Sequence, residues 1–431
     1  MRTAAVVAML AAAAQAKAPR DSLGLDAIYP ELDSLYLDLH KNPELSGREE
    51  KTAAKLADRL RRLGYEVTTG VGGTGVVGVL RNGSGPTVLL RTELDALPVE
   101  EKTGLPYASK ATATDPAGKT VPVMHACGHD VHMASWTGAA ALLMRAKDRW
   151  RGTLVMVGQP AEETVAGAKA MLADRFFERF PKPDFSVAVH DSSDLPAGKV
   201  AWIPGYALAN VDSVDVTLFG RGGHGAKPET TVDPVVIAAR TVLSLQTLVS
   251  REKDPLEPAV LTVGSIHGGN KHNIIPDDVH LQITVRSYTP QVRKQLLDGI
   301  ARIAKAEAAA AAAPREPEIR TSEGANATFN DPVVTKRLGA MLARELGQEN
   351  VVEGRPEMVA EDFGEFGKAA GVPSVLLRIG AVEPAKHASA RSSGTPLPSL
   401  HSATFAPDRE PTIRTGATVL ALSALELFGK R

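Results

Sequence analysis

Several common features are scarce in this chain, and each scarcity excludes something. A single cysteine among 431 residues cannot form an intramolecular disulfide. Aromatic residues make up only 4% of the chain, so a platform for stacking nucleic-acid bases is not expected. The net charge is −1, which gives no positive excess to attract nucleic acid or an anionic membrane. We therefore expect neither nucleic acid nor a membrane as a partner.

The N-terminus is the most apolar segment. Met1 and Arg2 precede an alanine-rich apolar run, and small residues surround a potential cleavage point after Ala16. This pattern is typical of a secretory signal peptide, and the run is too short to span a membrane comfortably. We predict a signal peptide at residues 1–16 and a secreted or periplasmic protein. The alternative is a simple alanine-rich tail.

Residues 124–132 are unusually rich in metal-binding side chains. They contain three histidines, an aspartate and the only cysteine of the chain. Imidazole and thiolate are preferred ligands of zinc and similar divalent ions, and Cys127 and His129 are close enough in sequence to share one ion. The alternative is that Cys127 is a small buried apolar residue and that the histidines pack or cap a helix.

Polar residues also follow three predicted buried strands. A strand at 89–97 carries Glu93 and Asp95, and apolar runs at 154–158 and 187–189 precede Glu162-Glu163 and His190. Sites in α/β folds lie at the carboxyl ends of strands, so we expect these side chains to converge there. Of two adjacent carboxylates, one can bind metal and the other can act as a base. The alternative for Glu93 and Asp95 is a solvated position on the rim.

The order of predicted elements indicates two domains. Residues 206–320 follow a β-α-β-β-α-β order, which is typical of ferredoxin-like units, and the α/β pattern resumes after them. We predict an α/β catalytic domain made of residues 21–205 and 321–431, with a mostly parallel central sheet flanked by helices. Residues 206–320 are predicted to form an inserted α+β domain.

Eight short motifs, in order along almost the whole chain, carry a family resemblance. The sequence resembles the dinuclear-metal aminoacylase and carboxypeptidase family of metallopeptidases, and in it the amidohydrolase branch with hippurate hydrolases and IAA-amino acid (auxin) conjugate hydrolases. The motifs are Arg91-Thr-Glu-Leu-Asp-Ala-Leu-Pro, Gly104-Leu-Pro-Tyr-Ala-Ser, His125-Ala-Cys-Gly-His-Asp, Gln159-Pro-Ala-Glu-Glu, Gly222-Gly-His-Gly-Ala, Asn273-Ile-Ile-Pro, Glu361-Asp-Phe and Leu400-His-Ser.

The resemblance implies a site with two divalent ions, which could be Zn, Mn, Co or Ni. It implies five metal ligands, with Cys127 as the bridge: Cys127, His129, Glu163, His190 and His401. Glu162 matches the general base, and Asp95 matches a residue that orients a ligand.

The resemblance also assigns roles to the inserted domain, which serves as a lid and usually dimerises. His224 matches the residue that contacts the scissile carbonyl, often from the partner subunit, and Asn273 and Arg286 match positions associated with the substrate carboxylate. We predict a homodimer that hydrolyses the amide bond of N-acyl amino acids or small peptides by a metal-bound water.

Two other functions remain open. Thr92-Glu93-Leu94 and the glycine after His224 depart from the usual family pattern, and the polar segment 386–398 is long. These departures leave open a non-catalytic, metal-dependent binding protein on the same fold, although the intact Glu162 argues against it. A dipeptidase or aminopeptidase of similar dinuclear design is the other alternative.

Overall fold

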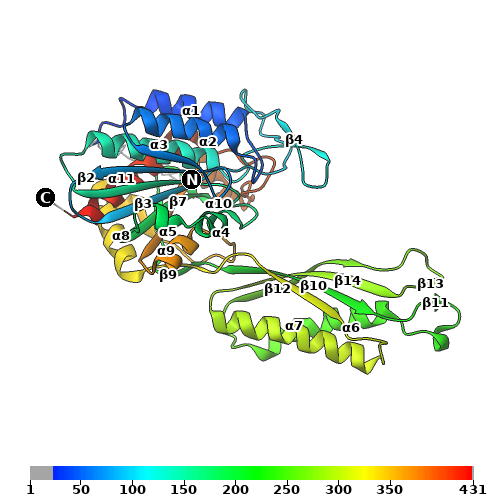
Figure 1. Ribbon diagram of the computed structural model, residues 1–431. Coiled ribbons are helices and arrows are strands. Elements are labelled where there is room, and N and C mark those ends of the chain that lie inside the picture. Colours follow the sequence, from blue (N-terminus) through cyan, green and yellow to red (C-terminus); the bar gives the residue numbers. More distant parts are fainter. Residues whose placement is uncertain (1–22, 430–431) are drawn as a thin grey trace, which may run out of the picture.

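The computed structural model describes residues 23–429 and has two parts, each built on its own sheet (Figure 1). The larger part contains an eight-stranded sheet, whose strands in spatial order are β1 (Glu66–Val71), β2 (Gly75–Asn82), β6 (Gly152–Gln159), β3 (Thr87–Glu93), β7 (Phe185–Pro196), β18 (Ser374–Val382), β8 (Val200–Trp202) and β17 (Val351–Glu353). The central strands β6, β3, β7 and β18 all run parallel to their neighbours in this group. This confirms the predicted largely parallel sheet.

Strand β3 shows why the centre of the sheet is buried on both faces. Val88, Leu89 and Leu90 are completely buried. Val88 and Leu90 belong to one hydrophobic cluster and Leu89 to another, because successive side chains of a strand point to opposite faces. A continuous apolar run of this kind is typical of a parallel strand covered by helices on both sides.

Helices supply both covering layers. Those that contribute to the larger cluster are α1 (Tyr29–Lys41), α2 (Glu50–Arg62), α3 (His129–Arg145), α8 (Pro332–Leu346) and α11 (Arg409–Phe428). Those that contribute to the smaller cluster are α4 (Gly167–Ala173), α5 (Phe176–Arg179) and α9 (Gly364–Ala370). The carboxyl ends of the parallel strands, and the loops that follow them, lie between these two helical layers.

The smaller part has the predicted ferredoxin-like order. It consists of β10 (Asn210–Phe219), α6 (Pro234–Thr247), β12 (Ala259–His267), β14 (Asp278–Ser287), α7 (Pro290–Ala310) and β15 (Glu318–Glu323). Its antiparallel sheet has the order β12-β14-β10-β15. Both helices begin at a proline that follows a side-chain cap, Asp233 or Thr289. The fold class is confirmed, while the exact domain limits at 205 and 320 remain predictions.

Short elements depart from the sequence-based expectations. The polar segment after residue 383 carries α10 (Pro384–Ser393), and β3 ends at Glu93, earlier than the predicted strand 89–97. Three small pairs lie outside both sheets: β4 (Thr112–Thr114) with β5 (Thr120–Pro122), β9 (Gly205–Leu208) with β16 (Thr328–Asn330), and β11 (Gly223–His224) with β13 (Ile274–Ile275). Such short strands carry too little periodicity to be seen in the sequence.

Within residues 23–429 no helix combines the length and apolar character that crossing a membrane requires. The predicted signal peptide at residues 1–16 lies outside the described residues, so secretion remains a prediction.

Candidate metal centre

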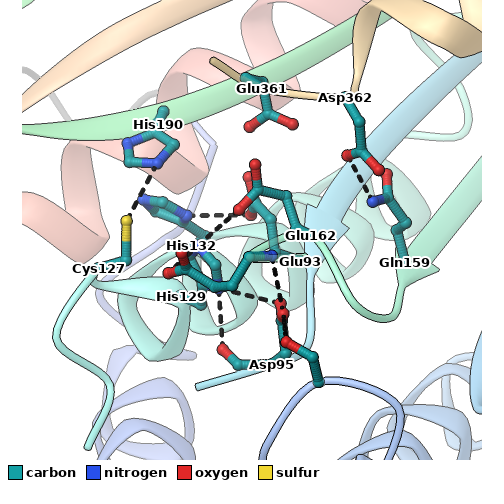
Figure 2. A network of polar contacts seen from close by, with 12 residues as sticks. Glu93, Asp95, Cys127, His129, His132, Gln159, Glu162, His190, Glu361 and Asp362 are labelled. Carbon is teal, nitrogen blue, oxygen red and sulfur yellow. Dashed lines mark hydrogen bonds and ion pairs between the residues drawn. The ribbon is translucent and has the colours of Figure 1, made fainter. Parts of the chain in front are cut away.

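The five predicted metal ligands come together at the carboxyl-terminal edge of the central sheet. Figure 2 labels three of them, Cys127, His129 and His190. Cys127 and His129 lie at the start of α3, Glu163 follows β6, His190 lies on β7, and His401 lies in the loop before α11. The sequence separation between the first and the last is large, so only the fold places them in one cluster.

The distances between donor atoms show how close this cluster is. Cys127 Sγ lies 3.2 Å from His401 Nε2 and 3.7 Å from His190 Nε2. Glu163 Oε2 lies 3.4 Å from His401 Nε2, and Glu163 Oε1 lies 3.9 Å from His129 Nε2. Cys127 is therefore central, since its sulfur faces two histidines.

The donor set fits divalent metal ions. His129 Nδ1 lies 2.8 Å from the Asp95 carbonyl oxygen, and His190 Nδ1 lies 2.8 Å from the Asp191 carbonyl oxygen. A ring N–H donated to a carbonyl leaves Nε2 with its lone pair, which is the usual arrangement of a metal-binding histidine. His129 Nε2 and Glu163 Oε1 are buried without any hydrogen-bond partner. Buried polar atoms are rarely left unpaired, so a cation between them is the natural partner.

Asp95 supports two members of the cluster. Its Oδ2 accepts hydrogen bonds from Ser46 Oγ at 2.6 Å and from the Glu163 backbone N–H at 2.9 Å, and its Oδ1 lies 3.4 Å from His129 Nδ1. Burial raises the pKa of Asp95, but His129 and Ser46 outweigh that effect and lower it below its ordinary value. The carboxylate therefore stays ionised and holds both residues.

Glu162 lies on the other side of His129, with its carboxylate 3.7 Å from His129 Nε2. Burial, together with the charges of Glu361 and Glu163, raises the pKa of Glu162 well above its ordinary range. Burial also raises the pKa of Glu163, to about 7. This region holds more carboxylates than its buried surroundings tolerate, a condition that bound cations relieve.

Unusual backbone conformations support the site. Gly128 has φ +74°, and a Cβ at this position would collide with the carboxylate of Asp191. Two residues other than glycine also have positive φ values: His401, with +64°, and Ala161, which directly precedes Glu162 and Glu163, with +50°. Left-handed conformations cost about 1 kcal/mol or more for residues other than glycine and concentrate at functional sites.

The other two histidines of this stretch lie in different surroundings from His129, although His132 belongs to a second group of potential metal donors with Glu93, His129 and His190. His132 Nδ1 lies 3.0 Å from Glu93 Oε2, and its Nε2 lies 3.2 Å from Asp191 Oδ1, so both nitrogens are occupied. Burial lowers the pKa of His132, but these two carboxylates raise it to about 9. His125 is buried with both nitrogens unpaired, and burial lowers its pKa to about 4. A neutral His125 packs beside the site.

A cluster of buried charges, to which the sequence analysis gave no role, lies beside Glu162. Arg91 is fully buried and binds Glu93, Glu361 (2.8 Å) and Asp362 (3.1 Å), and its Nε donates to Gln159 Oε1 at 2.9 Å. Glu93 and Asp95 are completely buried, so the alternative of a solvated rim position is wrong for both. The matching signal in the sequence was the pair of motifs containing Arg91 and Glu361-Asp362.

The three predicted residues of the inserted domain are not part of this cluster. His224 on β11 is exposed, and β11 pairs with β13 next to Asn273. Figure 1 shows this pair at the end of the small domain farthest from the eight-stranded sheet. Arg286 on β14 lies near the junction instead, where its Nη1 donates to the Met358 carbonyl at 3.3 Å. Within one chain, His224 and Asn273 are thus separated from the metal ligands.

Comparison with known proteins decides the family. The family model described as "Peptidase family M20/M25/M40" matches residues 89–403, which include every predicted ligand and the whole inserted domain. The chain belongs to this family. Thermostable carboxypeptidase 2 of Saccharolobus solfataricus is 36% identical over 396 residues, which cover 91% of this chain and 94% of that protein. The hippurate hydrolase of Campylobacter jejuni is 38% identical, over 78% of this chain and 85% of that protein.

A solved structure with the same fold is described as binding two metals. The Bacillus subtilis YXEP protein, described as a dinuclear metal binding peptidase from the M20 family, has a TM-score of 0.76 and 26% identity, and the match covers 94% of this chain and all of that one. As a member of the M20/M25/M40 peptidase family, this chain is a metal-binding hydrolase that acts on amides. Its candidate ligand residues include Cys127, His129 and Glu163, whose donor atoms lie within 4.8 Å of one another.

Proposed function

We propose that the protein hydrolyses the amide bond of N-acyl amino acids or small peptides with two divalent ions bound at this centre. The unpaired donor atoms of His129 and Glu163, directly beside Cys127 and Glu162, carry the proposal. The residues that would hold the ions are Cys127, His129, Glu163, His190 and His401, and Cys127 would be the ligand shared between them. The hippurate hydrolase among the relatives supports this substrate class.

The chemistry that such ions supply is Lewis acidity toward a carbonyl oxygen and a lower pKa for water. Glu162 takes the proton of the attacking water and delivers it to the leaving amine. Burial suits Glu162 to this role, because a raised pKa makes its carboxylate a stronger proton acceptor than an ordinary glutamate. Asp95 keeps His129 and Glu163 in place during the reaction.

His224 suits the carbonyl oxygen of the scissile amide. Its Nδ1 accepts a hydrogen bond from the Ala226 backbone N–H at 3.0 Å, so the neutral ring carries its proton on Nε2. That N–H is exposed and can donate to an oxygen on which negative charge develops. Because His224 lies far from the metal ligands of its own chain, we propose that it acts in a homodimer, on the site of the partner subunit, together with Asn273.

Replacing Glu162 with glutamine tests the proposal. Glu162→Gln keeps the shape of the side chain but cannot accept a proton, so we expect kcat to fall about 10²- to 10⁴-fold while the bound metal stays constant. Turnover is measured on a panel of N-acyl amino acids and free-amine dipeptides, with Zn, Mn, Co or Ni added, and metal content by elemental analysis. Activity within a few-fold of wild type would reject Glu162 as the base. A wild type that cleaves only free-amine dipeptides would favour an aminopeptidase instead.

A further inference from the structure

Arg378, a residue with no role so far, lies next to the metal centre in the central sheet of the large domain. It is on β18, and the parallel pairing with β7 places it directly opposite His190. Neighbouring strands are about 4.8 Å apart, so Arg378 is one strand spacing from a proposed metal ligand. Its guanidinium group can easily reach across that distance.

Arg378 and His190 also point to the same face of the sheet. Leu376 and Ala188, two residues earlier on the two strands, belong to one small hydrophobic cluster with residues from β9. Because side chains alternate along a strand, Arg378 continues the side of Leu376, and His190 continues that of Ala188. Arg378 therefore faces the side on which the inserted domain joins.

The guanidinium group of Arg378 is incompletely paired for such a buried charge. Only 7% of the residue is exposed, and its Nε has no hydrogen-bond partner among residues 23–429. One ion pair is present, 3.2 Å from Nη1 to Glu357 Oε1, and the Glu357 side chain is 39% exposed. Buried charges are normally fully paired, and an exception of this kind needs a functional explanation.

A two-residue segment joins Arg378 to the arginine of the other domain. Glu357 pairs with Arg378, and the carbonyl of the next residue, Met358, accepts from Arg286. The segment is itself anchored, because the Glu357 backbone N–H donates to the Ala207 carbonyl at 2.9 Å. Glu357 is the ion-pair partner of Arg378, whereas Arg286 binds a backbone carbonyl. The two guanidinium groups and the one carboxylate therefore carry one net positive charge at the domain junction.

We propose that Arg378 is a specificity-determining residue that binds the carboxylate of the substrate together with Arg286. The free Nε–H of Arg378 and the fork of Arg286 supply the donors, and their surplus charge matches one carboxylate. Glu357 orients Arg378 and offsets its charge, so the site accepts a monocarboxylate. This inference rests on the proposed function and names the feature of the amino-acid moiety that the enzyme recognises.

The test compares a substrate with its uncharged analogue. Arg378→Met keeps an unbranched side chain of similar length, and Arg378→Lys keeps the charge but loses the fork. For an N-acyl amino acid, we expect kcat/KM to fall about 10- to 100-fold in Arg378→Met, mainly through KM. For the same compound with a carboxamide in place of the carboxylate, we expect kcat/KM to change by less than about threefold. The uncharged carboxamide makes no charge-assisted bond to Arg378 in the wild type, so the substitution removes little. Arg344→Met, on the exposed side of α8, is the control and should change neither value.

A binding measurement separates this inference from the proposed function. N-benzoylglycine and N-benzoylglycinamide are titrated by calorimetry into the metal-loaded Glu162→Gln protein, with and without Arg378→Met. The inference predicts that the acid binds more tightly than the amide and that Arg378→Met removes the difference. Equal binding of the acid by both proteins overturns the inference, even if wild type is an active hydrolase. Absence of turnover in wild type overturns the proposed function, while the titration still tests Arg378.

Glu357→Gln provides an opposite change at the same place. Removing its charge leaves two net positive charges, so we expect kcat/KM for N-acyl aspartate and N-acyl glutamate to rise about 10-fold relative to N-acyl alanine. A purely structural role for the Arg378–Glu357 pair predicts equal losses for all three substrates in both Arg378→Met and Glu357→Gln. That result would overturn the inference, and melting temperatures of all variants show whether each remains folded.

Discussion

Two buried polar clusters lie next to each other in the large domain, and they differ in how completely they are paired. In the first, each side chain around Arg91 has a protein partner, down to Gln159, whose amide donates to Asp362 Oδ1 at 2.6 Å. In the second, around Cys127, His129 Nε2 and Glu163 Oε1 have no hydrogen-bond partner. The Arg91 cluster is completely buried, whereas the Cys127 cluster reaches solvent at His401, whose side chain is 55% exposed.

The difference teaches which cluster serves the fold and which serves a ligand. A buried network whose hydrogen bonds are all made fixes the positions of its members. The Arg91 cluster holds the end of β3 against the segment before α9, and so it fixes the wall behind Glu162. A buried network with open donor atoms is costly without a partner, and its open atoms show where that partner binds. The Cys127 cluster is therefore the one that a metal completes.

Breaking the paired cluster should have the largest effect. Arg91→Met leaves the carboxylates of Glu93, Glu361 and Asp362 buried without their cation, and removing one partner from a buried ion pair costs about 3–5 kcal/mol. We expect the free energy of unfolding to fall by this amount, measured by urea denaturation in the presence of a chelator. Arg344→Met, whose exposed guanidinium lies 3.9 Å from Glu345, is the control and should change it by less than about 1 kcal/mol. An equally small change for Arg91→Met would contradict the structural role.

Breaking the open cluster should instead have little effect on stability and a large effect on metal binding. Cys127→Ala removes one buried sulfur atom, which costs about 1 kcal/mol of stability in the metal-free protein. Metal binding should weaken by more than about 100-fold, because 100-fold is the upper end of the range for residues that only support ligands and Cys127 is proposed to be a ligand itself. Elemental analysis after gel filtration and chelator titration measure this. Full metal content in purified Cys127→Ala would show that the thiolate is not a shared ligand.

The sequence predicted the open cluster better than the paired one. Cys127 and His129 were visible as a local concentration of ligand types, and Glu163 and His190 as polar residues after apolar strands. His401 was found only through the family resemblance, since an isolated histidine in a loop carries no local signal. The role of Arg91 could not be predicted, because its partners Glu361 and Asp362 are about 270 residues away and only the tertiary fold brings them together.

The fold followed a similar rule. Strands with continuous apolar runs, such as β3, were predicted from the sequence, and so was the order of elements in the inserted domain. The short pairs β9–β16 and β11–β13 were not, because strands of two to four residues show no pattern. Those pairs nevertheless position His224 and the junction near Glu357, so the parts of the site that depend on them could be placed only by the structure.

Ser46→Ala should have the smallest effect. It tests how far the support for the metal ligands extends beyond Asp95. Ser46 donates to Asp95, which in turn supports His129 and Glu163, so its hydroxyl acts on the metal only through two further residues. A single hydrogen bond of this kind is worth about 1 kcal/mol, so we expect metal affinity to fall about three- to tenfold. At saturating metal, kcat should be unchanged, because Glu162 is untouched.

The matched control for that variant is Ser250→Ala in the inserted domain, whose hydroxyl donates to the Gln246 carbonyl at 3.0 Å and has no link to the ligands. It should leave metal affinity unchanged in the same chelator titration. If both serine variants behave alike, Asp95 does not depend on Ser46, and its hold on His129 and Glu163 comes from the backbone alone. If only Ser46→Ala weakens metal binding, the open cluster extends outward through Asp95 to the loop that follows α1, and support for the metal reaches beyond the ligands themselves.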